Sequence, residues 1–149
     1  MTSTPDPSFA GRTYPSGPVH VVSGAKIAEF ARATGAADPV HTDDAAARAA
    51  GHAGVVATPT FLVSLAQSAE AAYIEDPEAG IDFSRVVHGE EGFELHRSVV
   101  AGDRLVPTLT VESVRAAGGH SMITTRVDVA DEAGEAVAAV RSVIVVRGE

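Results

Sequence analysis

Residues 58–74, TPTFLVSLAQSAEAAYI, decide the fold of this chain. Thr58 is typical of a helix N-cap, and Pro59 is typical of the first helical position. Apolar side chains then recur at the spacing of one helix face, at Phe61, Leu62, Leu65, Ala69 and Ala72. The stretch therefore predicts a helix of about four turns that ends near Ile74 and is apolar enough to lie in the core.

The sequence after this helix predicts a sheet. Beyond a loop at residues 76–80 the apolar pattern changes to period two, which is typical of strands. The candidate strands lie near residues 84–99, 104–116, 120–130 and 135–147. Residues 101–103 and 131–134 have the composition of hairpin turns between consecutive strands. The strands are therefore predicted to pair antiparallel.

Pro107 lies early in the second of these strands. Because proline cannot donate a hydrogen bond to its neighbour, we expect it at an edge, a bulge or a strand end. Helices followed by consecutive strands indicate the α+β class, with one long helix in the concavity of a curled sheet. A chain of 149 residues, 45% of them hydrophobic, is expected to form a single domain over residues 1–149.

A shorter helix is predicted upstream of residues 58–74. Ser23 can cap it, and its apolar positions recur at helical spacing. Gly35 supplies the left-handed residue that commonly ends a helix. This first helix is thus expected to end where the most informative polar segment of the chain begins.

That segment is GAADPVHTD, residues 35–43. Pro39 favours an extended or turn conformation at Asp38. Asp43 and the acidic residue after it then start a short alanine-rich helix that closes at Gly51. His41 is therefore expected on a loop between two helices.

The composition limits the compartment and the partners. A formal charge of -9 argues against nucleic acid, which is bound by clustered Lys and Arg. The chain has no Cys, which excludes disulfides and thiolate metal sites. Residues 1–11 do not resemble a signal peptide, and no apolar run reaches the length of about 18 residues that spans a membrane. We expect a soluble, cytoplasmic protein without a membrane partner.

Several segments in order carry a family resemblance. They are GRTYP at 11–15, KI and EFA within 26–31, GAADPVHTD at 35–43, PTF at 59–61, VHGE at 87–90 and AGDRL at 101–105. Together they resemble the MaoC-like hot-dog dehydratase family. They are most similar to its single-domain group, which includes the N-terminal domain of MaoC dehydratases and the accessory subunits of (3R)-hydroxyacyl-ACP dehydratases. The resemblance implies a hot-dog fold, in which an antiparallel sheet wraps around a long central helix.

The chain departs from the family's motif, Gly-Asp-x-Asn-Pro-x-His-x-Asp, at two positions. Ala36 stands where the first Asp is expected and Asp38 where the Asn is expected, while His41 is retained. In the intact motif the resemblance implies that His and Asp perform the proton transfers. Loss of water from a 3-hydroxyacyl thioester needs a base at C2 and an acid at the departing 3-hydroxyl. Because the histidine is retained and the acid is lost, the sequence leaves open whether this chain is catalytic by itself or acts with a second chain.

His41 and Asp38 are the candidate catalytic residues. For His41 the competing interpretation is a solvated loop histidine that fixes a turn. Asp38 is a candidate replacement for the missing acid, and a turn-capping aspartate is the competing interpretation.

The candidate substrate-binding residues lie in two segments. Thr58, Thr60 and Phe61 open the long helix, where the N–H groups of Thr60 and Phe61 could stabilise charge on the thioester oxygen. His88 and Gly89 lie on a predicted strand, where they could line the path of the acyl or pantetheine group. This chemistry needs neither a metal nor an organic cofactor. Three further histidines lack the spacing of a metal site, namely His52, His96 and His120.

The leading hypothesis is a subunit of a (3R)-hydroxyacyl-thioester dehydratase, or enoyl hydratase, that acts on ACP or CoA thioesters. The resemblance implies a heterodimer with a second hot-dog chain that carries the intact Asp/His motif, in fatty acid or polyketide biosynthesis. Three alternatives stay open. They are a self-sufficient homodimeric hydratase that uses His41, an acyl-thioesterase in which Asp38 or Glu70 activates water, and a non-catalytic acyl-binding scaffold.

Overall fold

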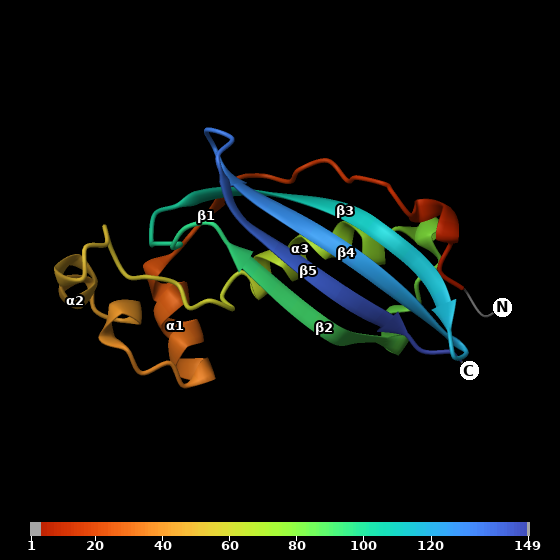
Figure 1. Cartoon of the computed structure of the whole chain (residues 1–149), viewed down its shortest axis with the longest axis horizontal. Helices are drawn as coiled ribbons and strands as arrows, with labels where there is room; N and C mark the ends of the chain where they lie inside the picture. The colour runs from red at the N-terminus through yellow and green to blue at the C-terminus, as the bar shows by residue number, and fades with distance from the viewer. Residues whose placement is uncertain (1–3, 149) are drawn as a thin grey trace.

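In the computed structural model, which describes residues 4–148, a curled antiparallel sheet lies against one central helix (Figure 1). The helices are α1 (Gly24–Thr34), α2 (Asp44–Ala49) and α3 (Val63–Ile74). The strands are β1 (His20–Val21), β2 (Val86–Leu95), β3 (Arg104–Ala117), β4 (His120–Asp131) and β5 (Ala136–Val146). The predicted α+β class is confirmed. The predicted domain, residues 1–149, includes residues 1–3 and 149, which lie outside the described residues, and it stays a prediction.

The sheet has the order β1-β3-β4-β5-β2 with antiparallel pairing throughout. The turn at residues 131–134 joins β4 to β5, as predicted, with Asp131 N–H donating to the Glu135 carbonyl. The hairpin predicted at residues 101–103 is wrong, because β2 pairs with β5 and not with β3. This turn instead hydrogen-bonds to Val22 through Gly102 and Asp103. A turn sequence specifies a local reversal of the chain but does not specify which strands pair.

Pro107 pairs with Val129 of β4 on one side of β3. On the other side β1 pairs only with Leu105 and Arg104. Among residues 4–148, no strand pairs with Pro107 on that side of β3, so the expected edge position is confirmed.

The two short helices have the predicted caps. The Ser23 hydroxyl accepts a hydrogen bond from Lys26 N–H at the start of α1, and Gly35 ends the helix with φ +74°. At α2 the Asp43 carboxylate accepts from two backbone N–H groups, and Gly51 follows with φ +92°. Local side-chain chemistry therefore fixes both ends of the segment that carries His41.

The central helix begins later than predicted. α3 starts at Val63, and Thr58 does not cap it. Thr60 and Phe61 instead lie in tight turns, in which Phe61 N–H donates to the Thr58 carbonyl and Val63 N–H to the Thr60 carbonyl. The preceding residue, Ala57, is tied to Val99 by a backbone hydrogen bond of 2.8 Å. After this hydrogen bond the chain forms turns that are too tight for an α-helix. The α-helix therefore begins at Val63.

The core lies between α3 and the concave face of the sheet. Leu62, Leu65 and Tyr73 of the helix segment are buried. They belong to one core cluster with inward side chains of the sheet, namely Leu105, Leu109, Val111, Ile123, Val127, Val140 and Ile144. Each such side chain contributes roughly 1.5 to 3 kcal/mol by leaving water. Within residues 4–148 no helix is both long and apolar enough to span a membrane.

Candidate functional site

His41 ends a short 3-10 turn, Pro39–His41, between α1 and α2. The Asp38 carboxylate caps this turn by accepting from Val40 N–H at 3.1 Å. The Val40 carbonyl in turn accepts from Val56 N–H at 2.9 Å, which ties the turn to the segment that leads into α3. The loop predicted for His41 is therefore a fixed turn beside the mouth of the central helix.

One hydrogen bond sets the chemistry of the His41 ring. Its Nδ1 lies 2.6 Å from the carbonyl oxygen of Val56. Because a carbonyl oxygen can only accept, Nδ1 carries the hydrogen. In the neutral ring Nε2 then has the free lone pair and can accept a proton.

His41, Asp38 and Thr58 line one pocket of about 320 Å³, whose apolar walls include Leu62 and Leu95. The Thr58 hydroxyl is buried and has no hydrogen-bond partner among the described residues. A buried hydroxyl without a partner costs about 1 to 3 kcal/mol. Thr58 is therefore suited to bind a polar atom of a ligand that enters beside His41.

Among the described residues, His41 has no carboxylate partner in this pocket. Asp38 uses one carboxylate oxygen in its turn. Within the described residues no hydrogen bond or ion pair joins the side chains of Asp38 and His41. Ala36 has an apolar side chain, and its N–H closes the end of α1 on the Ala31 carbonyl. The arrangement can accept a proton at His41, but the carboxylate expected of the intact motif is missing.

Thr60 and Phe61 do not line this pocket. Phe61 N–H is already used in the turn to Thr58, and the helix N-terminus lies at Val63. The prediction that the N–H groups of both Thr60 and Phe61 are free to bind the thioester oxygen is therefore wrong for Phe61. The Phe61 ring is buried and packs edge-on against Phe30, with ring centroids 5.7 Å apart.

His88 and Gly89 lie near the start of β2, whereas Leu95 at the end of the same strand lines the His41 pocket. Leu95 lies seven positions after His88 along the strand, which is roughly 20 Å. The predicted site residues therefore occupy two places. His88 Nε2 faces two carboxylates, with Glu70 Oε2 at 3.6 Å and Glu91 Oε1 at 3.8 Å.

The sequence indicated Glu70 only as a carboxylate that could activate water in a thioesterase, and it did not indicate the other polar residues around His88. Thr125 and Ser142 occupy inward positions that alternate with Val and Ile on β4 and β5, and both are buried. Glu70 is fully buried in the middle of α3. A polar residue at a position where the strand or helix pattern expects an apolar one is the signal that could have identified this cluster. No group of three metal-ligating side chains within residues 4–148, this cluster included, has the geometry to hold a metal ion.

The polar cluster around His88 consists of Glu70, Glu91, Thr125 and Ser142, and it shifts the pKa of Glu91. Burial raises the pKa of its carboxyl, the hydrogen bond from Ser142 lowers it, the nearby Glu70 raises it and His88 lowers it. Burial is the largest of these causes, so the proton is held more tightly than on an exposed glutamate.

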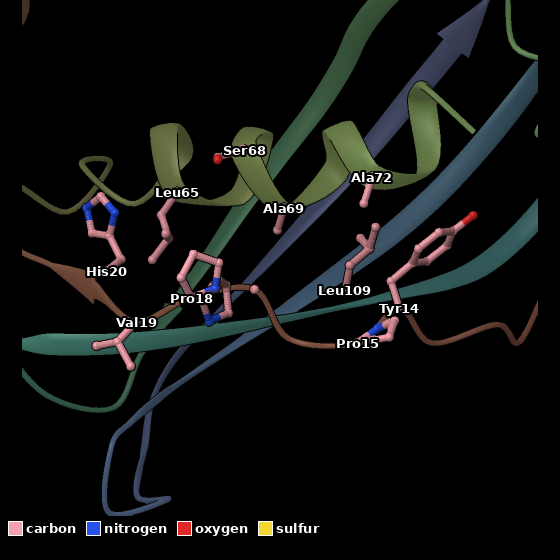
Figure 2. Close-up of a pocket in the computed structure, with 12 residues that line it drawn as sticks. Tyr14, Pro15, Pro18, Val19, His20, Leu65, Ser68, Ala69, Ala72 and Leu109 are labelled. Atoms are coloured by element: carbon pink, nitrogen blue, oxygen red, sulfur yellow. The ribbon is translucent and has the colours of Figure 1, made fainter. Parts of the chain in front are cut away.

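A second cavity, of about 230 Å³, lies between α3 and the segment that precedes β1 (Figure 2). Figure 2 shows Leu65, Ala69 and Ala72 on the helix side and Pro15 and Pro18 across from them. An adjoining pocket of about 410 Å³ shares three of its lining residues and extends past Phe30 and Phe61. The shared residues are His20, Leu65 and Ser68. The two form a largely apolar groove along α3, of the kind that binds apolar ligands.

Comparison with known proteins relates this chain to dehydratases. Residues 8–140 match the family model described as FAS1-like, dehydratase domain region. The chain is 48% identical over 144 residues to a UPF0336 protein of Leifsonia xyli, with 97% of each chain covered.

Two solved structures are similar over nearly the whole chain. One is the C-terminally truncated HadBC (3R-hydroxyacyl-ACP dehydratase) complex from Mycobacterium tuberculosis, with a TM-score of 0.83 and 25% identity over 92% of this chain and 96% of that chain. The other is a MaoC-like dehydratase, with a TM-score of 0.83 and 31% identity over 95% of this chain and 43% of that chain.

Proposed function

Because the chain belongs to the FAS1-like dehydratase-region family and has the MaoC-like hot-dog fold, we propose that it is a subunit of a (3R)-hydroxyacyl-thioester dehydratase. The same enzyme would hydrate enoyl thioesters in reverse. Its partner is a second hot-dog chain that carries the intact Asp/His motif. The substrate is an acyl thioester of ACP or CoA.

The observation that carries this proposal is the half-complete pocket at His41. Dehydration moves two protons, one from C2 and one to the leaving hydroxyl. The pocket offers Nε2 of His41 and the unpartnered hydroxyl of Thr58, and Ala36 leaves it without the motif acid. A partner with both groups supplies the complete chemistry, and this chain then completes the assembly and shapes the acyl site.

The exposed edge of the sheet supports a partner of the same fold. β2 pairs with β5 on one side, and within residues 4–148 no strand pairs with its other side. Val87 and Leu95 on this strand are each 42% exposed, and Phe83 just before it is 72% exposed. An open strand edge with apolar side chains readily pairs with another chain.

The groove along α3 supports an acyl ligand. Small side chains on the helix, among them Ser68, Ala69 and Ala72, leave room beside Leu65 and Leu109. A long apolar chain gains about 0.8 kcal/mol for each methylene that it buries. The groove therefore suits the acyl tail better than the charged carrier.

Co-expression with the intact hot-dog chain tests this function. The two chains should co-purify, and the pair should dehydrate (3R)-3-hydroxyacyl-CoA, whereas this chain alone should turn over poorly. The partner alone serves as the matched control for its own activity. Full activity from this chain as a homodimer would refute the accessory role.

The orientation of His41 favours a second candidate, a self-sufficient homodimeric hydratase. Nδ1 is fixed on Val56, which leaves Nε2 of the neutral ring as a proton acceptor on a residue that lines the pocket. In that enzyme, changing His41→Ala would lower the rate of the chain alone by about 10² to 10⁴-fold. An unchanged rate would exclude this candidate.

A further inference from the structure

A row of polar side chains crosses the concave face of the sheet beneath Glu70. Thr125 on β4 pairs with Ser142 on β5, and Ser142 pairs with Glu91 on β2. Residues directly opposite each other in a sheet point to the same face. Thr125 is 0% and Ser142 1% exposed, and Glu70 is 0% exposed. Four chain segments therefore bring polar groups to one place in an otherwise apolar core.

A β-bulge at Gly89 adds His88 to this row. His88 pairs with Ile144, but Glu90 pairs with Val143, so Gly89 is an extra residue in β2. In a regular strand His88 and Glu91 would point to opposite faces. The extra residue places both on the face toward α3 and turns Glu90 away.

The two carboxylates are anchored in the same way. Glu70 Oε1 accepts from the Thr125 hydroxyl at 2.7 Å, and Glu91 Oε2 accepts from the Ser142 hydroxyl at 2.8 Å. The second oxygen of each carboxylate is buried and has no hydrogen-bond partner among the described residues. Leaving such an oxygen unsatisfied is costly, which makes the pair suited to a ligand that donates a hydrogen.

Both unpartnered oxygens face the same imidazole nitrogen. The distances from His88 Nε2, 3.6 Å to Glu70 and 3.8 Å to Glu91, exceed a direct hydrogen bond. An oxygen atom placed beside the three groups, off the lines that join them, would lie within hydrogen-bond reach of each. Such an atom accepts from Nε2–H and donates to a carboxylate, which a hydroxyl group or water can do and an alkyl group or a ketone cannot.

We propose that Glu70, His88 and Glu91 form a binding site for one hydroxyl oxygen, which is the 3-hydroxyl of a hydroxyacyl thioester or the water that adds in reverse. The proposal rests on the function proposed above and names the substrate group that this cluster recognises. The site opens through His88 and Glu91, whose side chains are 34% and 21% exposed, and Glu70 closes its floor.

The position of the cluster on β2 brings it to the catalytic centre of the partner. In this chain the end of β2 lies beside the His41 pocket and the start of β2 carries the cluster. In Figure 1 the end of β2 points toward α1 and α2, away from its start. When two such edges pair antiparallel, the start of one strand meets the end of the other. The cluster therefore meets the motif pocket of the partner.

The test compares binding of (3R)-3-hydroxydodecanoyl-CoA and dodecanoyl-CoA, which differ in the hydroxyl alone. The two-chain complex is used, with the motif histidine of the partner replaced by alanine to prevent turnover. The wild-type cluster should favour the hydroxylated ligand by about 10 to 100-fold, as expected for a hydrogen bond to charged groups. Glu70→Gln and His88→Ala should remove most of this preference and leave dodecanoyl-CoA binding unchanged.

Glu90→Gln is the matched control, because Glu90 lies in the same strand on the opposite face and should keep the preference. Equal binding of both ligands to the wild-type complex would overturn the hydroxyl site and leave the proposed function standing. Binding of neither ligand would refute the proposed function and this site with it. If Glu70→Gln prevents folding or assembly, the His88→Ala variant tests the site, because His88 is partly exposed. If the His88→Ala complex still prefers the hydroxylated ligand, the hydroxyl site is overturned.

Discussion

The imidazole of His41 donates from Nδ1 to the Val56 carbonyl at 2.6 Å. We predict that the neutral ring is the Nδ1–H tautomer, because a carbonyl oxygen cannot donate in return. Long-range proton–nitrogen NMR spectra of the chain, at a pH where the ring is neutral, distinguish the two tautomers. His52 serves as a comparison within the same spectrum. An Nε2–H tautomer at His41 would show that the ring is not fixed on Val56.

Burial raises the pKa of the Glu91 carboxyl above its ordinary value of 4.5. The folded state then binds the proton more tightly than the unfolded chain does. Its contribution to stability is present at low pH and is lost as the pH rises from 4.5 through the raised pKa of the folded state. Glu91→Gln mimics the protonated acid, so the variant should gain stability relative to wild type over this window.

Urea unfolding at a series of pH values measures this difference. Glu90→Gln changes the same charge on the other face of β2 and should show no comparable gain. A stability difference between Glu91→Gln and wild type that does not change with pH would contradict the assignment.

The sequence predicted part of the candidate site and could not predict the rest. His41, Asp38 and Thr58 meet in one pocket because the local ties at Val40 and Val56 bring the motif to the mouth of α3. The contact of His88 with Glu70 joins positions that are remote in sequence, and it depends on one extra residue in β2. Alternation alone places a residue on one face or the other, but it does not reveal a bulge.

At the scale of elements, two glycines end turns with a left-handed backbone and differ in their surroundings. Gly35 ends α1 with φ +74°, and an added Cβ would have no atom within 4 Å. Gly80 has φ +69°, and an added Cβ would lie 2.6 Å from the Thr4 carbonyl oxygen. We predict that Gly35→Ala costs about 1 kcal/mol from backbone strain alone.

Gly80→Ala should cost more, because the clash with Thr4 adds to the strain. The free energy of unfolding in urea measures both variants against wild type. Equal losses would contradict the close approach of the N-terminal segment to the turn after α3.

Elements with local signals were predictable from the sequence, and elements set by distant contacts were not. Ser23, Gly35 and Asp43 fix their helix ends by hydrogen bonds or backbone geometry within a few residues. The segment before α3 is held instead by the backbone hydrogen bond between Ala57 and Val99, two residues that are remote in sequence. β1 spans two residues, too few for an alternating pattern to show.

Within residues 4–148, the molecule has an open sheet edge at β2, the His41 pocket at one end of that strand and the buried carboxylate cluster at the other. In the proposed dimer, two chains paired along β2 would place each pocket beside the cluster of the other chain. An accessory chain can therefore lose its own motif acid and still contribute to the reaction in its partner. The central claim is that turnover depends on the motif of the partner and not on His41.

A comparison of two histidine replacements in the reconstituted pair tests this claim most directly. The rate of (3R)-3-hydroxyacyl-CoA dehydration is measured with the motif histidine of the partner changed to alanine, and separately with His41→Ala in this chain. We expect a loss of about 10² to 10⁴-fold for the first change and a rate within a few fold of wild type for the second. A large loss from His41→Ala together with full turnover in the partner variant would contradict the claim.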